Sequence, residues 1–328
     1  MRVLVVGCGS IGQRHARLLN ARADVEVAVC DVLEENLEAA SQHAGCTERY
    51  RRLEEALACP FEAAVVATPN DSHAAVAVAA LRAGLDVLLE KPMADTVAAA
   101  ETIAEAADTT GRLLMVAYNM RHHPGLREMK RIVDKGRIGR LVGGRAMVGS
   151  YYTLMCARTP FRLTEKGILA VDASHELDFL RWFFGDVVEV SARTARTGDL
   201  EMKPDPNLAA ALLTYRSGAI VGVHMDYVQH PQRRIFEVYG DAGTLVLDFQ
   251  TSVLEEYHPA EEGHRRRFFP HHRDAYYIDE HDAFFEAMRT RVSPIAAEDG
   301  LGALRVCEAI LRSAQERTPV PLQQEGSA

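Results

Sequence analysis

Residues 2–12 read RVLVVGCGSIG, a short apolar run that passes directly into a glycine-rich turn. Gly7, Gly9 and Gly12 form the pattern G-x-G-x-x-G, which is typical of a strand, a tight turn and a helix that bind a dinucleotide. The first glycine permits the turn, the second lets the backbone approach a pyrophosphate, and the third allows close packing of helix on strand. Cys8, Ser10 and Ile11 complete the turn, and the helix N-terminus offers N–H groups to phosphates.

Asp31 follows Gly12 by 19 residues and stands at the end of the second predicted strand. An acid at this place can bind both ribose hydroxyls of NAD and repels the 2′-phosphate of NADP. No Lys or Arg follows directly to hold that phosphate. We therefore expect NAD as the cofactor, with NADP as the alternative. Asp31 could also serve as a cap or turn residue for the next helix, and the two roles are compatible.

The composition is that of a globular enzyme, with 328 residues, 48% hydrophobic and 25% charged. A net charge of -9 disfavours a nucleic-acid partner, which needs clustered positive charge. The basic run at residues 265–267 is expected to be a solvated loop. Because the six cysteines form no C-x-x-C pair and there is no signal-peptide core or 18-residue apolar run, we expect a cytoplasmic protein without membrane segments.

The pattern of strands and helices predicts two domains. Residues 1–120 alternate short β-branched runs with helical patterns, which indicates an α/β domain with a doubly wound parallel sheet. Residues 121–328 form an α+β part, in which successive strands joined by short turns predict a mainly antiparallel sheet. Two helices close the chain, at about 274–290 and 299–315, and could pack on either half.

Glu90-Lys91-Pro92 closes a later strand of the first domain. Ligands of a doubly wound sheet bind in the crevice outside the carboxyl ends of its strands, so Lys91 is a candidate to donate a hydrogen bond to a substrate oxygen. Pro92 keeps Lys91 in extended geometry. A solvated lysine at a strand end is the alternative. The preceding strand ends in further crevice candidates, namely Thr68, Pro69, Asn70 and His73, with Asp71 or Ser72 as a possible helix N-cap.

Asp172 and His175 stand three residues apart near the start of a predicted helix, a spacing that can put both on one face. A histidine can take a hydroxyl proton near neutral pH, and a neighbouring carboxylate can orient it. The alternative is an N-cap at Asp172 or Ser174 and a structural His175. Because no histidine or cysteine spacing matches a metal site, we expect no metal.

Five segments spread over nearly the whole chain carry a resemblance to a known family. They are GCGSIGQRHARLL (7–19), ATPNDSHAAVAVAALRAGLDVLLEKP (67–92), YNMRHHPGLREMKRIVDKGRIG (118–139), DASHELDFLRWFFG (172–185) and DGLGALRVCEAILRSAQ (299–315). They resemble the glucose-fructose oxidoreductase, inositol dehydrogenase and rhizopine-catabolism family, usually called Gfo/Idh/MocA. Members typically oxidise a secondary alcohol of a sugar or cyclitol, or reduce the corresponding ketone, so the resemblance implies a small-molecule substrate.

The resemblance also implies a fold and a set of site residues. It implies a Rossmann domain over residues 1–120 and a domain with an open, mainly antiparallel sheet over 121–328, which binds substrate and often makes a homo-oligomer, a dimer or tetramer. The catalytic lysine of the family matches Lys91, and its Asp and His match Asp172 and His175. Cofactor contacts of the family fall on Cys8, Ser10, Ile11, Asp31, Thr68, Asn70, His73, Glu90 and Asn119.

Two points stay open in the sequence. Many family members space the Asp and His four residues apart; the spacing of three here rotates the histidine by about 100° on an ideal helix. Two other functions remain alternatives to a sugar, nucleotide-sugar or cyclitol dehydrogenase: a non-catalytic dinucleotide sensor, which intact Lys91 and His175 disfavour, and a redox-neutral NAD-dependent glycosidase. Candidates for substrate contacts, with ordinary packing as their alternative, are Tyr118, Arg121, Tyr151, Tyr152, Arg158 and Arg162.

Overall fold

The computed structural model describes residues 1–149, 151, 169, 173–198, 205–259, 263–270 and 272–322. The chain divides into two compact units. Unit 1 comprises Met1–Asn119 and His272–Leu304, and unit 2 comprises Met120–His271 and Arg305–Ala328. No helix in the described ranges is long and apolar enough to cross a membrane.

Unit 1 is built on a parallel sheet of six strands, called sheet A, with the order β3-β2-β1-β4-β5-β6. This confirms the doubly wound prediction for the N-terminal part. Apart from the edge strand β3, its strands are almost entirely buried, because helices cover both faces of such a sheet. The strands are β1 (Arg2–Val6), β2 (Glu26–Cys30), β3 (Glu48–Tyr50), β4 (Ala63–Val66), β5 (Asp86–Glu90) and β6 (Leu114–Ala117).

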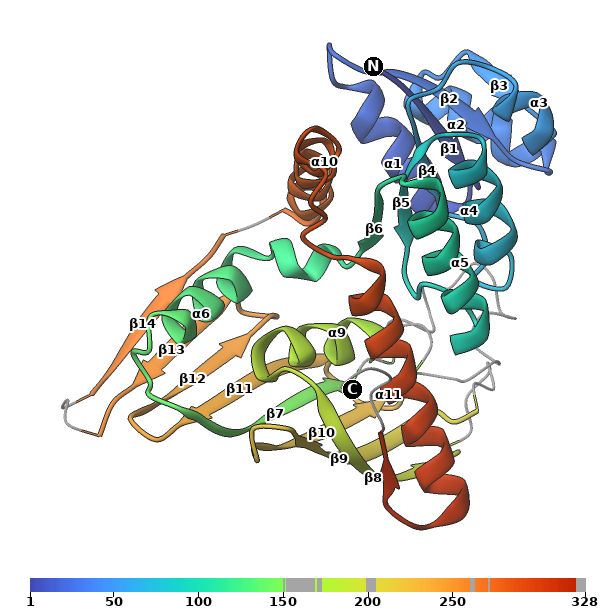
Figure 1. Ribbon diagram of the computed structural model, residues 1–328. Helices are drawn as coiled ribbons and strands as arrows, with labels where there is room; N and C mark the ends of the chain where they lie inside the picture. The colour runs from blue at the N-terminus through green and yellow to red at the C-terminus, as the bar shows by residue number, and fades with distance from the viewer. Residues whose placement is uncertain are drawn as a thin grey trace. The chain divides into compact units, whose positions relative to one another are not determined.

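The helices of unit 1 pack in pairs on sheet A: α1 contacts α2, and α4 contacts α5 (Figure 1). The strand order reverses between β1 and β4, so the carboxyl ends of these two neighbouring strands form the switch point where ligands bind in doubly wound sheets. The helices are α1 (Ser10–Asn20), α2 (Glu34–Ala44), α3 (Leu53–Leu57), α4 (His73–Arg82), α5 (Val97–Thr110) and α10 (Arg273–Thr290), with the first residues of α11 (Ala297–Glu316).

Unit 2 contains a nine-stranded sheet, called sheet B, with the order β14-β13-β12-β11-β7-β10-β9-β8-β15. Every neighbouring pair is antiparallel except β7 with β10, which confirms a mainly antiparallel sheet. The strands are β7 (Leu141–Gly149), β8 (Val187–Ala195), β9 (Leu208–Tyr215), β10 (Ile220–Asp226), β11 (Arg233–Gly240), β12 (Gly243–Asp248), β13 (Val253–Tyr257), β14 (His264–Phe268) and β15 (Val320–Pro321).

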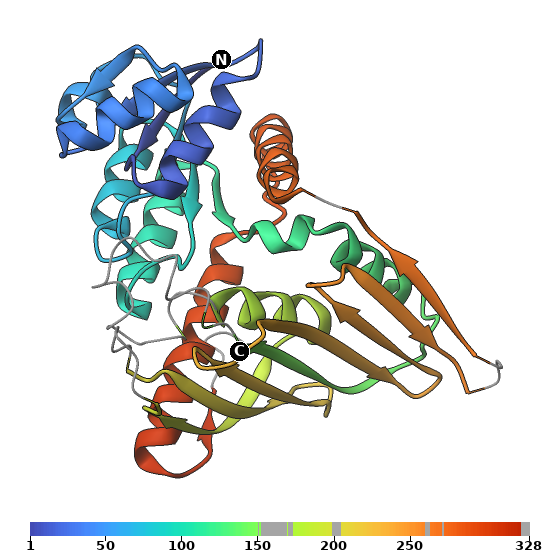
Figure 2. The ribbon, with the colours of Figure 1, turned by 180° about the vertical axis from the view of Figure 1, so that it is seen from behind.

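The two faces of sheet B differ. The helices α6 (Pro124–Asp134) and α9 (Ala173–Phe184) lie over one face, and a short 3-10 helix, η1 (Asn119–His122), precedes α6 (Figures 1 and 2). Residues on the covered face are buried, as in β9, where burial alternates along the strand. No described helix covers the opposite, open face, on which Leu212 and Ile220 are each 55% exposed.

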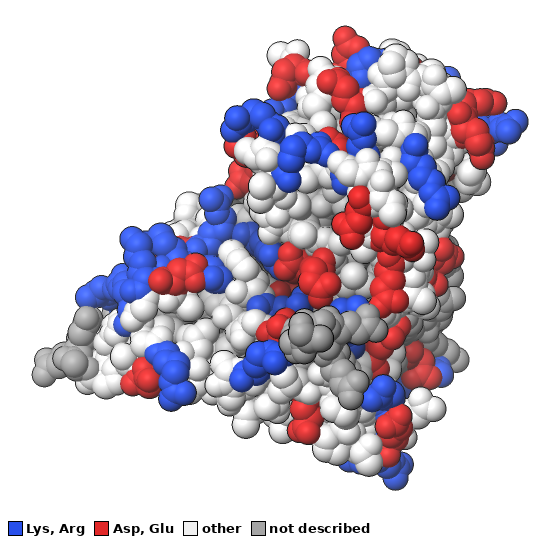
Figure 3. Space-filling model, in the orientation of Figure 1, with Lys and Arg blue, Asp and Glu red and all other residues white. Residues whose placement is uncertain are grey.

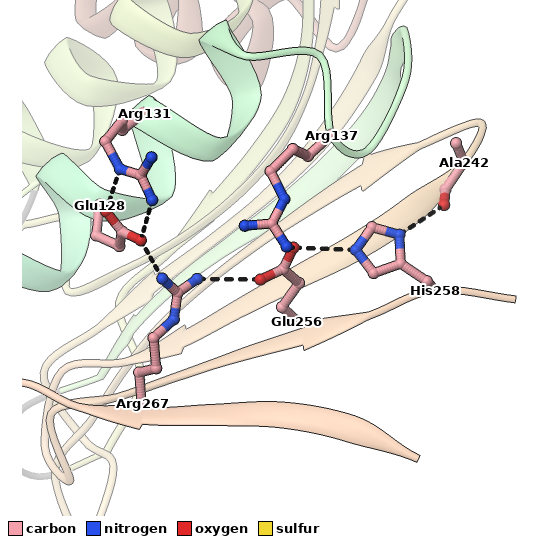
Figure 4. Close-up of polar contacts among 7 residues, drawn as sticks. All are labelled: Glu128, Arg131, Arg137, Ala242, Glu256, His258 and Arg267. Carbon is pink, nitrogen blue, oxygen red and sulfur yellow. Dashed lines mark hydrogen bonds and ion pairs between the residues drawn. The ribbon is translucent and has the colours of Figure 1, made fainter. Parts of the chain in front are cut away.

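The prediction of a loop at residues 265–267 was wrong, because these arginines lie in β14, the edge strand of sheet B. Arg265 and Arg266 are exposed, in agreement with the solvated part of that prediction. Arg267 donates to Glu128 on α6 and, at 3.0 Å, to Glu256 on β13 (Figure 4). Lys and Arg side chains gather over the α6 and β14 end of unit 2 (Figure 3). Cations along an edge strand discourage pairing with another sheet.

Glu256 on β13 is the carboxylate that holds β14 against its neighbours. Its side chain is buried, and in addition to Arg267 it is reached by Arg137 at 2.6 Å and by the Nε2 atom of His258 at 2.9 Å (Figure 4). A buried carboxylate without a partner is costly, so the two guanidinium groups and the ring nitrogen of His258 stabilise it. Arg137 and His258 therefore join Arg267 in holding the β13–β14 edge.

Candidate functional site

The three glycines of the first turn occupy different surroundings. Gly7 has φ 91°, and a Cβ there would lie 2.6 Å from the backbone of Ala67 at the end of β4. A Cβ at Gly12 would lie 1.7 Å from the carbonyl oxygen of Gly7. A Cβ at Gly9, the N-cap of α1, would meet no atom within 4 Å. Packing therefore requires Gly7 and Gly12, whereas Gly9 borders open space at a helix N-terminus, where a phosphate fits.

Asp31 is 9% exposed and fixes the loop between the first two strands. Its Oδ2 atom accepts hydrogen bonds from the N–H of Cys8 at 2.7 Å and from Asn36 at 3.0 Å, and its Oδ1 atom accepts from the N–H of Leu33 at 2.8 Å. Asp31 therefore has the turn role considered from the sequence. A carboxylate has about four acceptor positions, so these three bonds leave Oδ1 able to accept from a ribose hydroxyl as well.

The loop after β4 is joined to the turn after β5 by His73. One ring nitrogen of His73 lies 2.9 Å from the carbonyl oxygen of Thr68, and the other lies 2.9 Å from that of Pro92. Burial lowers the pKa of this histidine. Ser72 does not cap α4 with its side chain but donates to the carbonyl oxygen of Pro69 at 2.7 Å. The hydroxyl of Thr68 is buried and has no hydrogen-bond partner among the described residues.

Lys91 lies one residue beyond β5, at the carboxyl edge of sheet A. Its backbone N–H donates to Glu90 at 3.1 Å, and the Lys91–Pro92 peptide bond is cis. Glu90 is buried, and its Oε1 atom lies 3.0 Å from the Nε2 atom of His15 on α1. The sequence interpretation did not include His15 among the site residues. Its place in the pattern G-x-x-H of the first helix was the only available signal.

His175 lies in the first turn of α9 and is 8% exposed. The described part of this helix begins at Ala173, so the predicted partner Asp172 lies outside the described residues. The predicted substrate contacts Tyr152, Arg158 and Arg162 lie outside them too. Lys91 belongs to unit 1 and His175 to unit 2.

Two buried carboxylates beside His175 anchor α9 within unit 2. Glu176 pairs with both ends of the Arg234 guanidinium at 2.6 and 3.0 Å, and Asp178 pairs with Arg121 at 2.6 and 2.9 Å. Such bidentate pairs fix geometry strongly. The sequence interpretation missed both carboxylates as anchors, although two acids within an apolar helix are a usable signal. Because of them, the helix that carries His175 is held rigidly.

The other predicted contacts have structural partners. Tyr118 is part of the core of its region and Asn119 is buried. Arg121 is engaged by Asp178, and the ring of Tyr151 lies 4.5 Å from that of His230. Their contact with substrate stays a prediction. Among the described residues, no three His, Cys, Asp or Glu side chains are grouped so as to hold a metal ion.

Comparison with known proteins gives matches over both parts of the chain. Residues 1–118 match a family described as an oxidoreductase family with an NAD-binding Rossmann fold, and residues 126–246 match the GFO/IDH/MocA C-terminal domain.

Similar proteins extend over most or all of the chain. An inositol 2-dehydrogenase 1 of Saccharopolyspora erythraea is 30% identical, over 98% of this chain and 96% of its own length. A D-apiose dehydrogenase of Paraburkholderia graminis is 31% identical, over 74% of this chain and 66% of its own length. A levoglucosan dehydrogenase solved with NADH has the same fold, with a TM-score of 0.89, 21% identity, and coverage of 99% of this chain and 100% of that one.

Proposed function

Because this chain belongs to the GFO/IDH/MocA family of oxidoreductases, we propose that it transfers a hydride between NAD and a secondary alcohol or ketone carbon of a sugar, nucleotide sugar or cyclitol. One observation carries this proposal. Three neighbouring parallel strands, β1, β4 and β5, are each followed within two residues by predicted site residues: the glycine turn, Thr68 and Lys91. These residues all lie at the carboxyl ends of the strands of sheet A, where doubly wound folds bind dinucleotides.

The residues of unit 1 fit NAD. Gly9 leaves room at the N-terminus of α1 for the pyrophosphate, and Asp31 keeps an acceptor position for the ribose. The negative charge of Asp31 also disfavours the 2′-phosphate of NADP. When bound, the nicotinamide supplies the position that accepts or returns the hydride.

Three residues are proposed to serve the reacting group of the substrate. Lys91 would donate a hydrogen bond to the reacting oxygen, His175 would exchange the hydroxyl proton, and Asp172 would orient the histidine. The rigid anchoring of α9 supports the role of His175, because proton transfer requires a fixed geometry. The names of the relatives, which include inositol and D-apiose dehydrogenases, support a polyhydroxylated substrate.

Substitution of Lys91 tests the assignment. Cyclitols, free sugars and nucleotide sugars are first screened with the wild-type protein by the absorbance of NADH. With the best substrate, Lys91→Ala should lower kcat by about 10²- to 10⁴-fold, because the oxygen loses its hydrogen-bond donor. NAD affinity should stay near that of the wild type. Lys135→Ala, at an exposed lysine of unit 2, is the control and should turn over normally. Near-normal turnover by Lys91→Ala would contradict the role.

We also propose that the protein is a cytoplasmic homo-oligomer, a dimer or tetramer, that pairs through the open face of sheet B. The exposed Leu212 and Ile220 lie on the adjacent strands β9 and β10 and support association there, because apolar side chains are enriched in such interfaces. The described cysteines are all free, which agrees with a reducing compartment.

A further inference from the structure

A chain of buried polar side chains connects α10 to the backbone of Lys91 within unit 1. The Nε2 atom of His281 lies 2.7 Å from the Nδ1 atom of His15, and the Nε2 atom of His15 lies 3.0 Å from Glu90. The second carboxylate oxygen of Glu90 accepts the N–H of Lys91. His15 is 0% exposed and His281 is 1% exposed, so water does not compete for these bonds. The residues come from three separate elements, α1, β5 and α10.

The positions of the hydrogen atoms on His281, His15 and Glu90 are linked. Of two imidazole nitrogens that share a hydrogen bond, one must donate and the other must accept. When Glu90 is ionised it accepts from Nε2–H of His15. When His15 carries a single ring proton, its Nδ1 accepts, so His281 donates from its own Nε2. The tautomer of His281 is therefore linked to the charge of Glu90.

Electrostatics favour an ionised Glu90. Burial by itself raises the pKa of this carboxyl, but the hydrogen bond from His15, followed by the charge and N–H of Lys91, lowers it below its ordinary value. Burial lowers the pKa of His281 well below its usual range, and the nearby charge of Arg22 lowers it further. His281 is thus a neutral partner for His15.

Three further titratable groups face Glu90, namely Glu280 and Tyr277 on α10 and His73 on α4. Glu280 on α10 is 0% exposed, and neither of its carboxyl oxygens has a hydrogen-bond partner among the described residues. Burial, and then the charge of Glu90, raise its pKa well above the ordinary value. Burial and the same two carboxyls raise the pKa of Tyr277 to about 12. On α4, burial lowers the pKa of His73, whose two ring nitrogens face backbone carbonyl oxygens. Of the two buried carboxyls, Glu90 is therefore the ionised one and Glu280 the protonated one.

We propose that His15 and His281 are positioning residues for the hydride transfer: they hold Glu90 as an oriented anion, and Glu90 holds Lys91 in place for the reacting oxygen. This inference rests on the proposed function. Glu90 acts on Lys91 in two ways, since it accepts the backbone N–H and its charge attracts the ammonium group. Two residues, Glu90 and Lys91, thus lie between His15 and the substrate.

Two substitutions at His15 separate this role from packing. His15→Leu removes the donor to Glu90, so burial then raises the pKa of Glu90, and the acid limb of the kcat/KM profile should move to higher pH. Its kcat should fall by about 10- to 100-fold, the size of effect expected when a catalytic group is displaced. His15→Gln retains an N–H donor and should restore most of kcat and the acid limb. KM for the substrate should change little in either variant.

Matched variants at His281, the far end of this row of hydrogen-bonded side chains, extend the test. His281→Gln keeps a donor for His15 and should behave like the wild type, whereas His281→Leu should show a smaller shift of the acid limb than His15→Leu. If His15→Leu and His15→Gln lower the melting temperature and the acid limb stays in place, the two histidines serve packing only, and the proposal is overturned.

A second measurement does not depend on turnover. NMR of isotope-labelled imidazole nitrogens in the full chain should show His281 neutral with its hydrogen on Nε2. Glu90→Gln should shift the signals of both rings, because the hydrogen positions are linked. Rings that do not respond to Glu90→Gln would overturn the linkage. Failure of the wild type to oxidise any substrate would instead count against the proposed function, so the two failures are distinguishable.

Discussion

At the scale of single residues, Glu280 makes the stability of the folded protein depend on pH. It is a buried carboxyl whose pKa is raised well above the ordinary value of 4.5, first by burial and then by the charge of Glu90. Above pH 4.5 the unfolded chain releases this proton while the folded chain keeps it. The stability contributed by this group is therefore complete below that pH and is lost as the pH rises, by about 1.4 kcal/mol per pH unit up to the pKa in the folded protein.

Glu280→Gln should remove this loss, because glutamine keeps the shape of the side chain and does not ionise. The melting temperature of the variant should exceed that of the wild type by an amount that grows as the pH rises above about 5. Thermal unfolding in a series of buffers measures it. Glu286→Gln, at an exposed glutamate of the same helix, is the control and should show no such growing gain. A constant difference at every pH would contradict a protonated Glu280.

Single residues of the site could be predicted only where a local pattern marks them. Asp31 and Lys91 follow strands directly, so the sequence alone indicates them. His15 and His281 are 266 residues apart, and only the packing of α10 on α1 brings their rings together. The same holds for Arg121 and Asp178, whose pairing makes a predicted substrate contact into an anchor of α9.

At the scale of elements, the turn between β1 and α1 offers the sharpest test of cofactor binding. Gly9→Ala should leave the melting temperature nearly unchanged, because the new Cβ would meet no protein atom within 4 Å. It should weaken NAD binding about tenfold or more, since the methyl group occupies the space of the pyrophosphate. Calorimetric titration with NAD measures this. Gly222→Ala in β10, whose Cβ would also meet open space, is the matched control and should bind NAD normally.

If Gly9→Ala bound NAD with wild-type affinity, the pyrophosphate would have to lie away from Gly9, and the prediction would be contradicted. Gly12→Ala makes a useful contrast, because its Cβ would clash with the carbonyl oxygen of Gly7. That variant should lose stability as well as NAD affinity.

Elements were predictable where apolar periodicity is strong, as in β1, β4 and α1. The edge strands β3 and β14 were missed because they read as charged segments, Glu-Arg-Tyr and His-Arg-Arg-Arg-Phe, that bury little apolar surface. The parallel pairing of β7 with β10 was missed because these strands are distant in the sequence, and short turns indicate only antiparallel neighbours.

At the scale of the whole molecule, the chain returns to unit 1 after it completes most of unit 2, and α10 supplies His281 and Glu280 to the first unit. The sequence left the position of the closing helices open, because helical periodicity shows that a face is buried but not what it packs against. Each unit is thus compact in space but is made of two separate stretches of sequence.

The central claim is that the protein transfers a hydride between substrate and NAD, and isotope transfer tests it most directly. The best substrate of the screen is prepared with deuterium on the reacting carbon and incubated with the full chain and NAD. We predict that the deuterium appears at C4 of the reduced nicotinamide in step with the formation of the ketone. If the substrate binds or is cleaved without any deuterium in NADH, a sensor or a redox-neutral enzyme describes the protein better, and the proposed function is contradicted.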